Sequence, residues 1–264
     1  MANDMQPSVF DAAVTAWREA LAARERMPNL FLMSVIAIAV LNLIYFGLVI
    51  VGFLVGPSLL GLIIGLIYAA IQGFLLTPLA IAVHRFVLLN ETHDGYRLDT
   101  QDQRFMKFFT FLACLFAIML IPRLIGDLLS SPMGPSATGE LIAFILSIVA
   151  TVIFVRNVIL FPAVAVDAPG AEWRNAMADT KGHSWRVFFI LLCVVLPPAI
   201  AVLILISIFF LIPLIGWIIA VAIQAAFAVF IVASAAAAAS RLYAAYANQL
   251  GRPPGLPSTA PASS

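Results

Sequence analysis

Long uncharged apolar blocks, separated by short polar segments, make up most of the chain. No charged residue occurs in 30–83 or in 187–239, whereas a single membrane-spanning helix needs only about 20 residues. Each block is therefore predicted to hold two helices, with breaks at 56–58 and 213–216, where Gly and Pro supply the turns. A third pair of apolar stretches flanks the turn-forming segment 130–139.

The fold class predicted from this pattern is all-α. It is a polytopic membrane helix bundle of six transmembrane helices arranged as three hairpins, with the N-terminus and the C-terminus in the cytoplasm. The bundle covers 30–246, and Pro78 and the pair Pro197-Pro198 are expected to distort two of its helices. The six helices are predicted at 30–55, 58–89, 105–129, 139–166, 187–211 and 216–246.

The segments before and after the bundle differ in character. Residues 1–29 are predicted to form a cytoplasmic amphipathic helix, because Ser8 and Asp11 resemble a helix-capping box. This helix either lies in the membrane interface, with Trp17 in the headgroup layer, or packs against the cytoplasmic rim of the bundle. Residues 247–264 lack apolar periodicity and are predicted to be a disordered cytoplasmic tail. The apolar face expected for the first helix consists of Phe10, Ala13, Val14, Trp17 and Leu21.

Composition supports a membrane protein and excludes several classes of function. The chain is 63% hydrophobic and 10% charged, against about 45–50% and about 25% in soluble domains. The net charge of +1 offers no basic surface for nucleic acid. Cys114 and Cys193 both lie in apolar runs and lack metal-ligand spacing, so neither a disulfide framework nor a zinc site is expected.

The distribution of basic residues predicts the orientation. With both termini in the cytoplasm, every Lys and Arg except Arg123 and Arg156 lies on the cytoplasmic side. The three loops on the opposite side contain none. This is the bias that the positive-inside rule requires, and it predicts a multi-pass membrane protein with both termini in the cytoplasm.

Arg156 is the most informative single residue, since an arginine inside a membrane is costly. It lies about 24 Å along the helix that starts near Glu140, close to the cytoplasmic edge of a hydrocarbon core about 30 Å thick. One interpretation is interfacial anchoring by snorkelling, and the other is a polar pocket shared with Asp167 or a lipid phosphate. The residues proposed to contact lipid or to line such a pocket are Arg156, Asp167, Trp173, Trp185 and Arg186.

A second intramembrane charge pair and several amides have structural explanations. Arg123 and Asp127 are four residues apart on one helix, so we expect a structural ion pair rather than a substrate site. Asn42, Gln72 and Gln224 lie in mid-helix, where hydrogen bonds between helices are their ordinary use.

The sequence predicts no catalytic residue, no cofactor and no metal. His84, His93 and His183 lack the spacing of a metal site. The segment 182–186, GHSWR, departs from the GxSxG nucleophile pattern at its last position. An intramembrane enzyme therefore ranks behind the non-enzymatic hypotheses.

The polar segment between the fourth and fifth helices carries a family resemblance. The resembling residues are Arg156, Phe161-Pro162-Ala163, Asp167, Gly170, Ala176, Gly182 and Trp185-Arg186. In these positions the chain resembles the YciC-like bacterial inner-membrane proteins and the related membrane domain of some glycerophosphodiester phosphodiesterases. It differs where Asp179-Thr180 replace the Arg-Ser-Trp-like residues of those relatives. The resemblance implies a multi-pass protein of the bacterial inner membrane with a role in envelope or lipid homeostasis, and it implies no catalytic residue.

The leading hypothesis is a non-enzymatic integral membrane protein that acts as a scaffold or lipid-associated module. The alternative is a small-solute permease or channel with a cavity between the Pro-broken helices, lined by Asn42, Gln72 and Gln224. The expected partners are membrane lipids, with a membrane-protein partner or a second copy of the chain also possible, and no nucleic acid.

Overall fold

The described part of the chain is helical throughout. The computed structural model describes residues 8–55, 59–129, 136–209, 211–212 and 215–251, without the side chains of 49–55, 59–62 and 127–128. Over these residues it contains nine helices and no strand. The helices are α1 (Val9–Arg26), α2 (Pro28–Val55), α3 (Leu59–Leu89), α4 (Gln103–Leu129), α5 (Ala137–Asn157), α6 (Leu160–Ala165), α7 (Trp173–Asp179), α8 (Ser184–Phe209) and α9 (Ile215–Tyr246).

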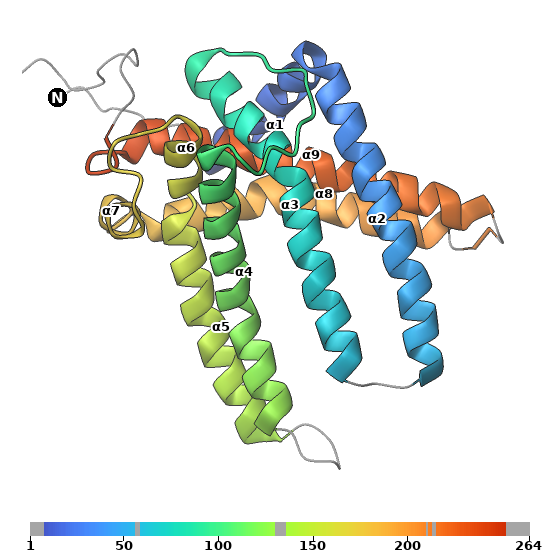
Figure 1. Cartoon of the computed structure of the whole chain (residues 1–264). Helices are drawn as coiled ribbons and strands as arrows, with labels where there is room; N and C mark the ends of the chain where they lie inside the picture. Colours follow the sequence, from blue (N-terminus) through green and yellow to red (C-terminus); the bar gives the residue numbers. More distant parts are fainter. Residues whose placement is uncertain (1–7, 56–58, 130–135, 210, 213–214, 252–264) are drawn as a thin grey trace, which may run out of the picture.

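Six long apolar helices form three hairpins, which confirms the predicted all-α fold of membrane-length helices in three pairs. The hairpins are α2–α3, α4–α5 and α8–α9, the last two being the most tightly paired (Figure 1). Six segments are long and apolar enough to cross a membrane, the fourth made of α5 and α6 together. Most helix ends lie within three residues of the predicted ones, because uncharged length alone defines these helices.

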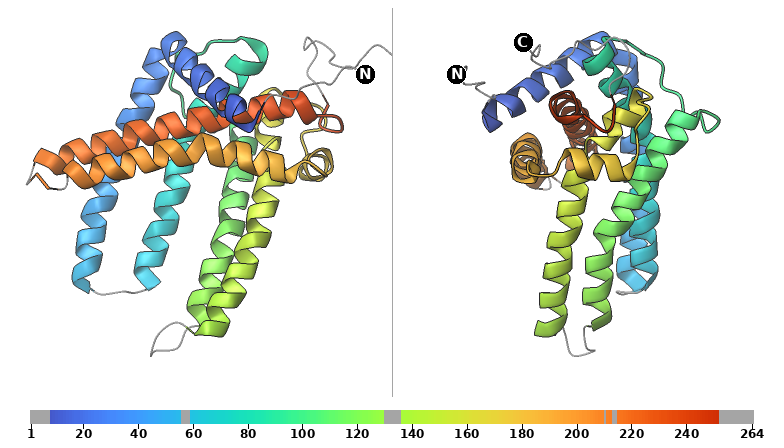
Figure 2. Two further views of the ribbon diagram at one scale, coloured as in Figure 1. Left: turned by 180° about the vertical axis from the view of Figure 1, so that it is seen from behind. Right: turned by 90° about the vertical axis from the view of Figure 1, so that its left-hand side faces the viewer.

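The α8–α9 hairpin lies across the other two. In Figure 1 the α2–α3 and α4–α5 hairpins point in one direction, and α8 and α9 run transversely behind their upper parts. Seen end-on in the right-hand view of Figure 2, α8 and α9 lie between α1 and the long hairpins. Chain order therefore predicts which helices pair, but not the direction of the third pair.

One end of the molecule gathers the polar segments. The loop 90–102, α6 and α7 all lie at this end, which we call the rim, whereas α2 and α4 end, and α3 and α5 begin, at the far end (Figures 1 and 2). Arg85, Arg97, Arg104 and Arg174 all belong to the rim segments or to the helix ends beside them. The rim thus carries basic residues that the sequence analysis assigned to the cytoplasmic side, and the orientation itself stays a prediction.

The helix predicted at 139–166 is in fact broken, which corrects the sequence prediction. α5 ends at Asn157, two residues form a turn, and the short helix α6 follows. The physical reason is Pro162, which has no N–H to donate to the carbonyl of Val158 four residues earlier. Pro162 instead occupies the first turn of α6, where the missing donor costs nothing.

α1 packs on the bundle mainly through small side chains, so the predicted apolar face is confirmed only in part, at Ala13 and Trp17, and is wrong at Phe10 and Leu21. Its cap is confirmed, because the backbone N–H of Asp11 donates to Ser8 Oγ at 3.1 Å. The predicted face members Phe10 and Leu21, however, are 64% and 45% exposed. The buried face consists of Ala13, Ala16, Ala20 and Ala23, and it contacts α8 and α9. Alanine is favoured on this face because its small side chain lets helix backbones approach closely.

α9 is the centre of the packing. It contacts α1, α2, α3, α6 and α8. Its alanine-rich run 234–240 is almost entirely buried, because small side chains let helix backbones approach closely. Gly61 and Gly65 form a small-xxx-small pattern, which is typical of closely packed helices, but a Cβ at Gly65 would meet no atom within 4 Å. The side chain position of Gly61 lies outside the described residues.

Candidate functional site

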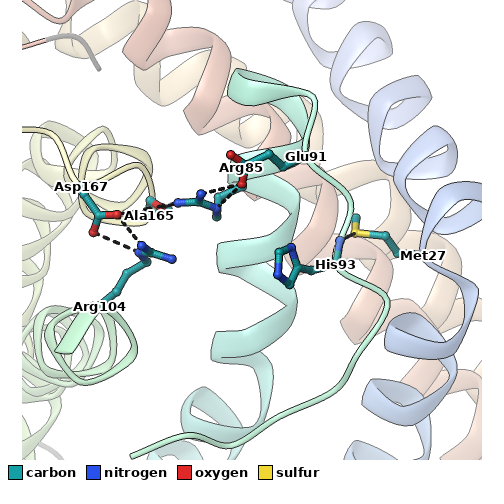
Figure 3. A network of polar contacts seen from close by, with 7 residues as sticks. All are labelled: Met27, Arg85, Glu91, His93, Arg104, Ala165 and Asp167. Carbon is teal, nitrogen blue, oxygen red and sulfur yellow. Dashed lines mark hydrogen bonds and ion pairs between the residues drawn. The ribbon is translucent and has the colours of Figure 1, made fainter. Parts of the chain in front are cut away.

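A network of ion pairs joins four segments of the rim (Figure 3). Arg85, at the end of α3, donates from Nε and Nη2 to Glu91 Oε2 at 2.8 and 2.5 Å. Its Nη1 donates to the carbonyl oxygen of Ala165 at 3.0 Å, which satisfies one of the carbonyls that the end of α6 leaves without an intrahelical partner. Arg85 therefore holds α6 and the loop 90–102 against α3.

Asp167 completes this network from the loop after α6. Arg104 binds it through two parallel contacts, one of them from Nε to Oδ1 at 3.0 Å and the other from Nη2 to Oδ2. Arg85 Nη1 lies 3.8 Å from the same carboxylate. Asp167 has a positive φ of 54°, a conformation that Asp tolerates better than most residues. The bidentate geometry fixes the position of the loop relative to α4.

The loop 90–102 also caps the start of α2. Asp94 accepts hydrogen bonds from the backbone N–H of Asn29 at 2.8 Å, from its side-chain amide at 2.5 Å and from the N–H of Leu30 at 3.2 Å. A carboxylate at a helix N-terminus satisfies orphan donors and complements the helix dipole. Tyr96 donates to the carbonyl oxygen of Leu75 at 2.9 Å, and burial raises the pKa of its phenol. This loop is thus a fixed part of the rim.

Arg156 serves α7. Its Nη2 donates to the carbonyl oxygen of Met177 at 2.5 Å, and its own carbonyl accepts from Thr180 Oγ1 at 3.0 Å. The Nε of Arg156 is buried and has no hydrogen-bond partner among the described residues. The described contacts give Arg156 and Asp167 different partners, so the structure does not join them in one polar pocket.

Asp179 was not singled out from the sequence, yet it organises the end of the chain. Its carboxylate accepts hydrogen bonds from the backbone N–H groups of Asn248, Gln249 and Leu250 at 2.9, 2.9 and 3.0 Å. The N–H of Gly170 donates to the carbonyl oxygen of Leu250 at 3.1 Å. Leu250 is fully buried, so residues 247–251 are held in place, and ordered structure extends into the segment predicted to be a tail. Residues 252–264 lie outside the described part.

The three remaining members of the predicted lipid set lie on different surfaces. Trp173 begins α7 and packs partly buried against the core. Trp185 is 76% exposed at the start of α8 and contacts the rings of Phe188 and Phe189. Arg186 borders a small cavity of about 180 Å³ between α1, α8 and α9, together with Arg241. Trp185 alone of these three lines a large groove.

That groove, the α5–α8 groove, has a volume of about 550 Å³ and separates α5 from the start of α8. Its walls are apolar except for three hydroxyl side chains. It is lined by Phe144, Ser147, Ile148, Thr151, Val152, Val155, Ser184, Trp185 and Phe188. The hydroxyls of Ser147 and Thr151 donate to carbonyls one turn earlier in α5, so the groove offers hydrocarbon surface rather than free polar groups.

A second hollow, the α3–α9 cleft, has a volume of about 410 Å³. It is bounded by α3, α4, α5, α6 and α9, and its side chains are apolar apart from Gln72, Thr77 and His84. Of the three amides predicted in mid-helix, only Gln72 borders this cleft. Asn42 accepts a hydrogen bond from Tyr68 at 2.7 Å between α2 and α3, the helix-to-helix bond expected for such an amide. Gln224 is exposed.

His84 and Ser240 form a buried contact that sequence reasoning missed, because the two residues lie 156 positions apart. Nδ1 of His84 lies 2.8 Å from Ser240 Oγ. Ser240 is fully buried, and its hydroxyl donates to the carbonyl oxygen of Ala236 at 2.9 Å. Within the described residues no carboxylate orients His84. The pair therefore lacks the accessible nucleophile and the third orienting group of a hydrolase site.

The other predicted positions add no reactive constellation. His93 lies near Met27, to whose Sδ its backbone N–H donates at 3.4 Å (Figure 3), and His183 stacks on Tyr246. No group of three or more His, Cys, Asp or Glu side chains that could hold a metal occurs in the described part of the chain. Arg123 lies near the far end of α4, and the side chain of its predicted partner Asp127 lies outside the described residues. That ion pair stays a prediction.

Taken by its chemistry, the site is a rigid ionic rim above two apolar hollows. Among the described residues, the two hollows offer apolar surface without a guanidinium group in their walls. The described residues provide no assembled catalytic set. Comparison with known proteins finds no matching family model, no matching curated protein and no matching solved structure.

Proposed function

We propose that the protein is a non-enzymatic, lipid-associated module of the bacterial inner membrane, with a scaffolding role in envelope or membrane homeostasis. The six apolar helices make it an integral membrane protein. The basic rim supports a cytoplasmic orientation of both termini. The resemblance of the segment 156–186 to YciC-like inner-membrane proteins supports the same compartment and role.

The α5–α8 groove is the observation that carries this proposal. It has the volume of a ligand site, within the usual range of about 300–1,000 Å³. Trp185 borders it beside the rim, where an indole ring lies at the level of lipid headgroups. Arg156 follows the groove residue Val155 directly in α5. A phospholipid acyl chain in the groove would thus bring its phosphate toward the cationic rim.

A small-solute permease is the second candidate, and Gln72 is the observation that favours it. This amide borders the α3–α9 cleft and has no hydrogen-bond partner within the described residues. The apolar lining counts against a water-filled route, because a solute pathway needs polar groups along its length. Asn42 is engaged by Tyr68 and Gln224 lies elsewhere, so the polar lining predicted for a permease is not assembled in the cleft.

Lipid retention by two matched variants tests the proposal. Val152→Trp fills the α5–α8 groove, whereas Val149→Trp adds the same ring to another exposed position of α5 that does not line the groove. We expect native mass spectrometry of the wild-type protein and of Val149→Trp to show bound phospholipid, and Val152→Trp to lose it. Equal retention by all three proteins would contradict the proposal. Solute flux into proteoliposomes that disappears in Gln72→Leu would favour the permease instead.

A further inference from the structure

His84 presents one unused ring nitrogen to the α3–α9 cleft. The side chain is only 2% exposed, and it lines the cleft beside Phe108 of α4. Its Nδ1 is occupied by Ser240. Nε2 has no hydrogen-bond partner among the described residues. It does not belong to the fully buried polar atoms that lack a partner, so part of its surface is accessible. The remaining accessible surface of His84 therefore faces the cleft.

The hydrogen bonds of Ser240 define what this nitrogen can do. The hydroxyl has a single proton, and Oγ donates it to the carbonyl oxygen of Ala236 at 2.9 Å. The contact of 2.8 Å with His84 then requires Nδ1 to carry the ring proton and donate to Oγ. In this neutral tautomer Nε2 has a lone pair and no proton. It can accept a hydrogen bond from a ligand and cannot donate one.

The rest of the cleft determines the shape and charge of such a ligand. Gln72 lies twelve residues before His84 on α3, which places the two polar groups about 18 Å apart along the helix. The walls between them are hydrocarbon, except for Thr77, whose hydroxyl donates to the carbonyl oxygen of Gly73 at 2.8 Å. No charged side chain among the described residues lines the cleft. A volume of about 410 Å³ along that length suits one hydrocarbon chain.

We infer that the α3–α9 cleft binds a neutral single-chain lipid that carries a hydroxyl headgroup, with the hydroxyl donating to Nε2 of His84. Charged headgroups are disfavoured because the cleft offers them no counter-charge. This inference rests on the proposed lipid-associated function and adds a second site with a different ligand class. The phospholipid proposed for the α5–α8 groove is not required at this position.

Two ligands with the same hydrocarbon chain, one with a hydroxyl donor and one in which a methyl group replaces the hydroxyl proton, test the inference. Hexadecanol has a hydroxyl proton, and hexadecyl methyl ether has the same chain without one. In native mass spectrometry of the full chain in detergent, we expect the wild-type protein to retain hexadecanol roughly three- to tenfold better than the ether, the value of one hydrogen bond. Equal retention of the two, or retention of neither, would overturn the inference.

Two substitutions separate ligand recognition from the structural role of the imidazole. His84→Asn keeps a polar atom near the position of Nδ1, so it preserves the contact with Ser240 but loses the acceptor in the cleft. His84→Gln places its amide oxygen near the position of Nε2. We expect preference for the alcohol to survive in His84→Gln and to vanish in His84→Asn. The reverse result would show that His84 matters only through Ser240, and it would overturn the assignment.

Blocking the cleft gives a readout that does not depend on His84. Leu112 lines the cleft, whereas Leu124 is exposed further along the same helix. Leu112→Trp should abolish retention of both ligands, and Leu124→Trp should change neither. Phospholipid retention distinguishes the two proposals: it should follow Val152→Trp and be unaffected by His84→Asn. If the wild-type protein shows no preference for the alcohol while phospholipid retention follows Val152→Trp, only the cleft proposal is refuted. If the alcohol preference behaves as expected while wild type, Val149→Trp and Val152→Trp retain phospholipid equally, only the groove proposal is refuted.

Discussion

Asp179 holds the end of the chain because its carboxylate accepts three consecutive backbone N–H groups. Hydrogen bonds to a charged acceptor each contribute about 1.5–3 kcal/mol, so Asp179→Asn, which leaves one amide oxygen, should release the segment 247–251. We expect amide hydrogen exchange at 248–250 to accelerate roughly tenfold or more. Glu172→Gln, a charge change at an exposed residue on the preceding loop, is the matched control and should leave exchange unchanged.

Gly170 contacts the segment 247–251, so a substitution there also tests how this segment is held. A Cβ at this residue would lie 2.2 Å from the carbonyl oxygen of Gln249, a contact that only a backbone shift can relieve. Gly170→Ala should therefore destabilise the protein by about 1–3 kcal/mol. Gly65→Ala, where the added methyl meets nothing within 4 Å, should be neutral or slightly stabilising. Thermal unfolding of both variants in detergent compares them, and equal midpoints would contradict the observed docking.

Single residues were predictable from the sequence only where the chemistry is local. The cap at Ser8 is read from two positions three residues apart, and the structure shows it. No local sequence pattern marks Asp94 or Asp179, because each accepts hydrogen bonds from backbone N–H groups more than 60 residues away. Arg156 was recognised as costly, yet its acceptor, a main-chain carbonyl in α7, carries no mark in the sequence.

At the scale of helices, α1 is attached to α8 through a proline. Pro198 has no N–H, so the carbonyl oxygen of Val194, four residues earlier, loses its intrahelical donor. Trp17 of α1 replaces the missing hydrogen-bond donor, since its Nε1–H donates to this oxygen at 3.0 Å. Val194 is fully buried, and an unsatisfied buried carbonyl costs about 1–3 kcal/mol. The distortion that the sequence predicts at Pro198 is therefore also the docking point of a distant helix.

A double-mutant cycle tests this attachment. Trp17→Phe keeps an aromatic ring and removes the donor, so it should destabilise the protein by about 1–2 kcal/mol. With Pro198→Ala the N–H of residue 198 can satisfy Val194, and Trp17→Phe should then cost less. A coupling of about 1 kcal/mol in unfolding free energy is expected. Additive effects would show that the tryptophan packs on α8 without compensating for the proline. Trp173→Phe, on α7, controls for loss of an indole elsewhere.

Helix ends were predictable from the sequence where the length of an uncharged run defines them. The face that a helix buries was not predictable, because it depends on the helices packed against it. The uncharged runs located α2, α3, α8 and α9 within a few residues of their ends. The break between α5 and α6 was missed, because Pro162 lies in an apolar run that reads as one span. α1 buries alanines rather than its larger apolar side chains, and only the position of the small-residue face of α9 explains that choice.

On the scale of the whole molecule, the transverse α8–α9 hairpin has to be reconciled with a bilayer. The segment 187–239 has no charged residue, and large apolar side chains are exposed along it, including Leu203, Leu211 and Ile218 at 64%, 82% and 67%. A helix that is apolar on all sides belongs in hydrocarbon rather than in the interface. If α2–α5 follow the membrane normal, the hairpin lies within the leaflet nearest the rim. α1 then covers it at the headgroup level, with its alanine face toward α8 and α9.

Cysteine labelling in intact cells tests this placement. On a background without Cys114 and Cys193, we would place single cysteines at Thr138, Lys181 and Ile212 and add a membrane-impermeant maleimide, which reacts only with thiols that water can ionise. Thr138→Cys, near the turn of the α4–α5 hairpin, should react from outside, and Lys181→Cys on the rim should react only after permeabilisation. Ile212→Cys, at the α8–α9 turn, should react in neither condition, because the turn lies in hydrocarbon. Reaction of Ile212→Cys from outside would show that the hairpin crosses the bilayer beside the other two, and that the transverse arrangement is not the one adopted in the membrane.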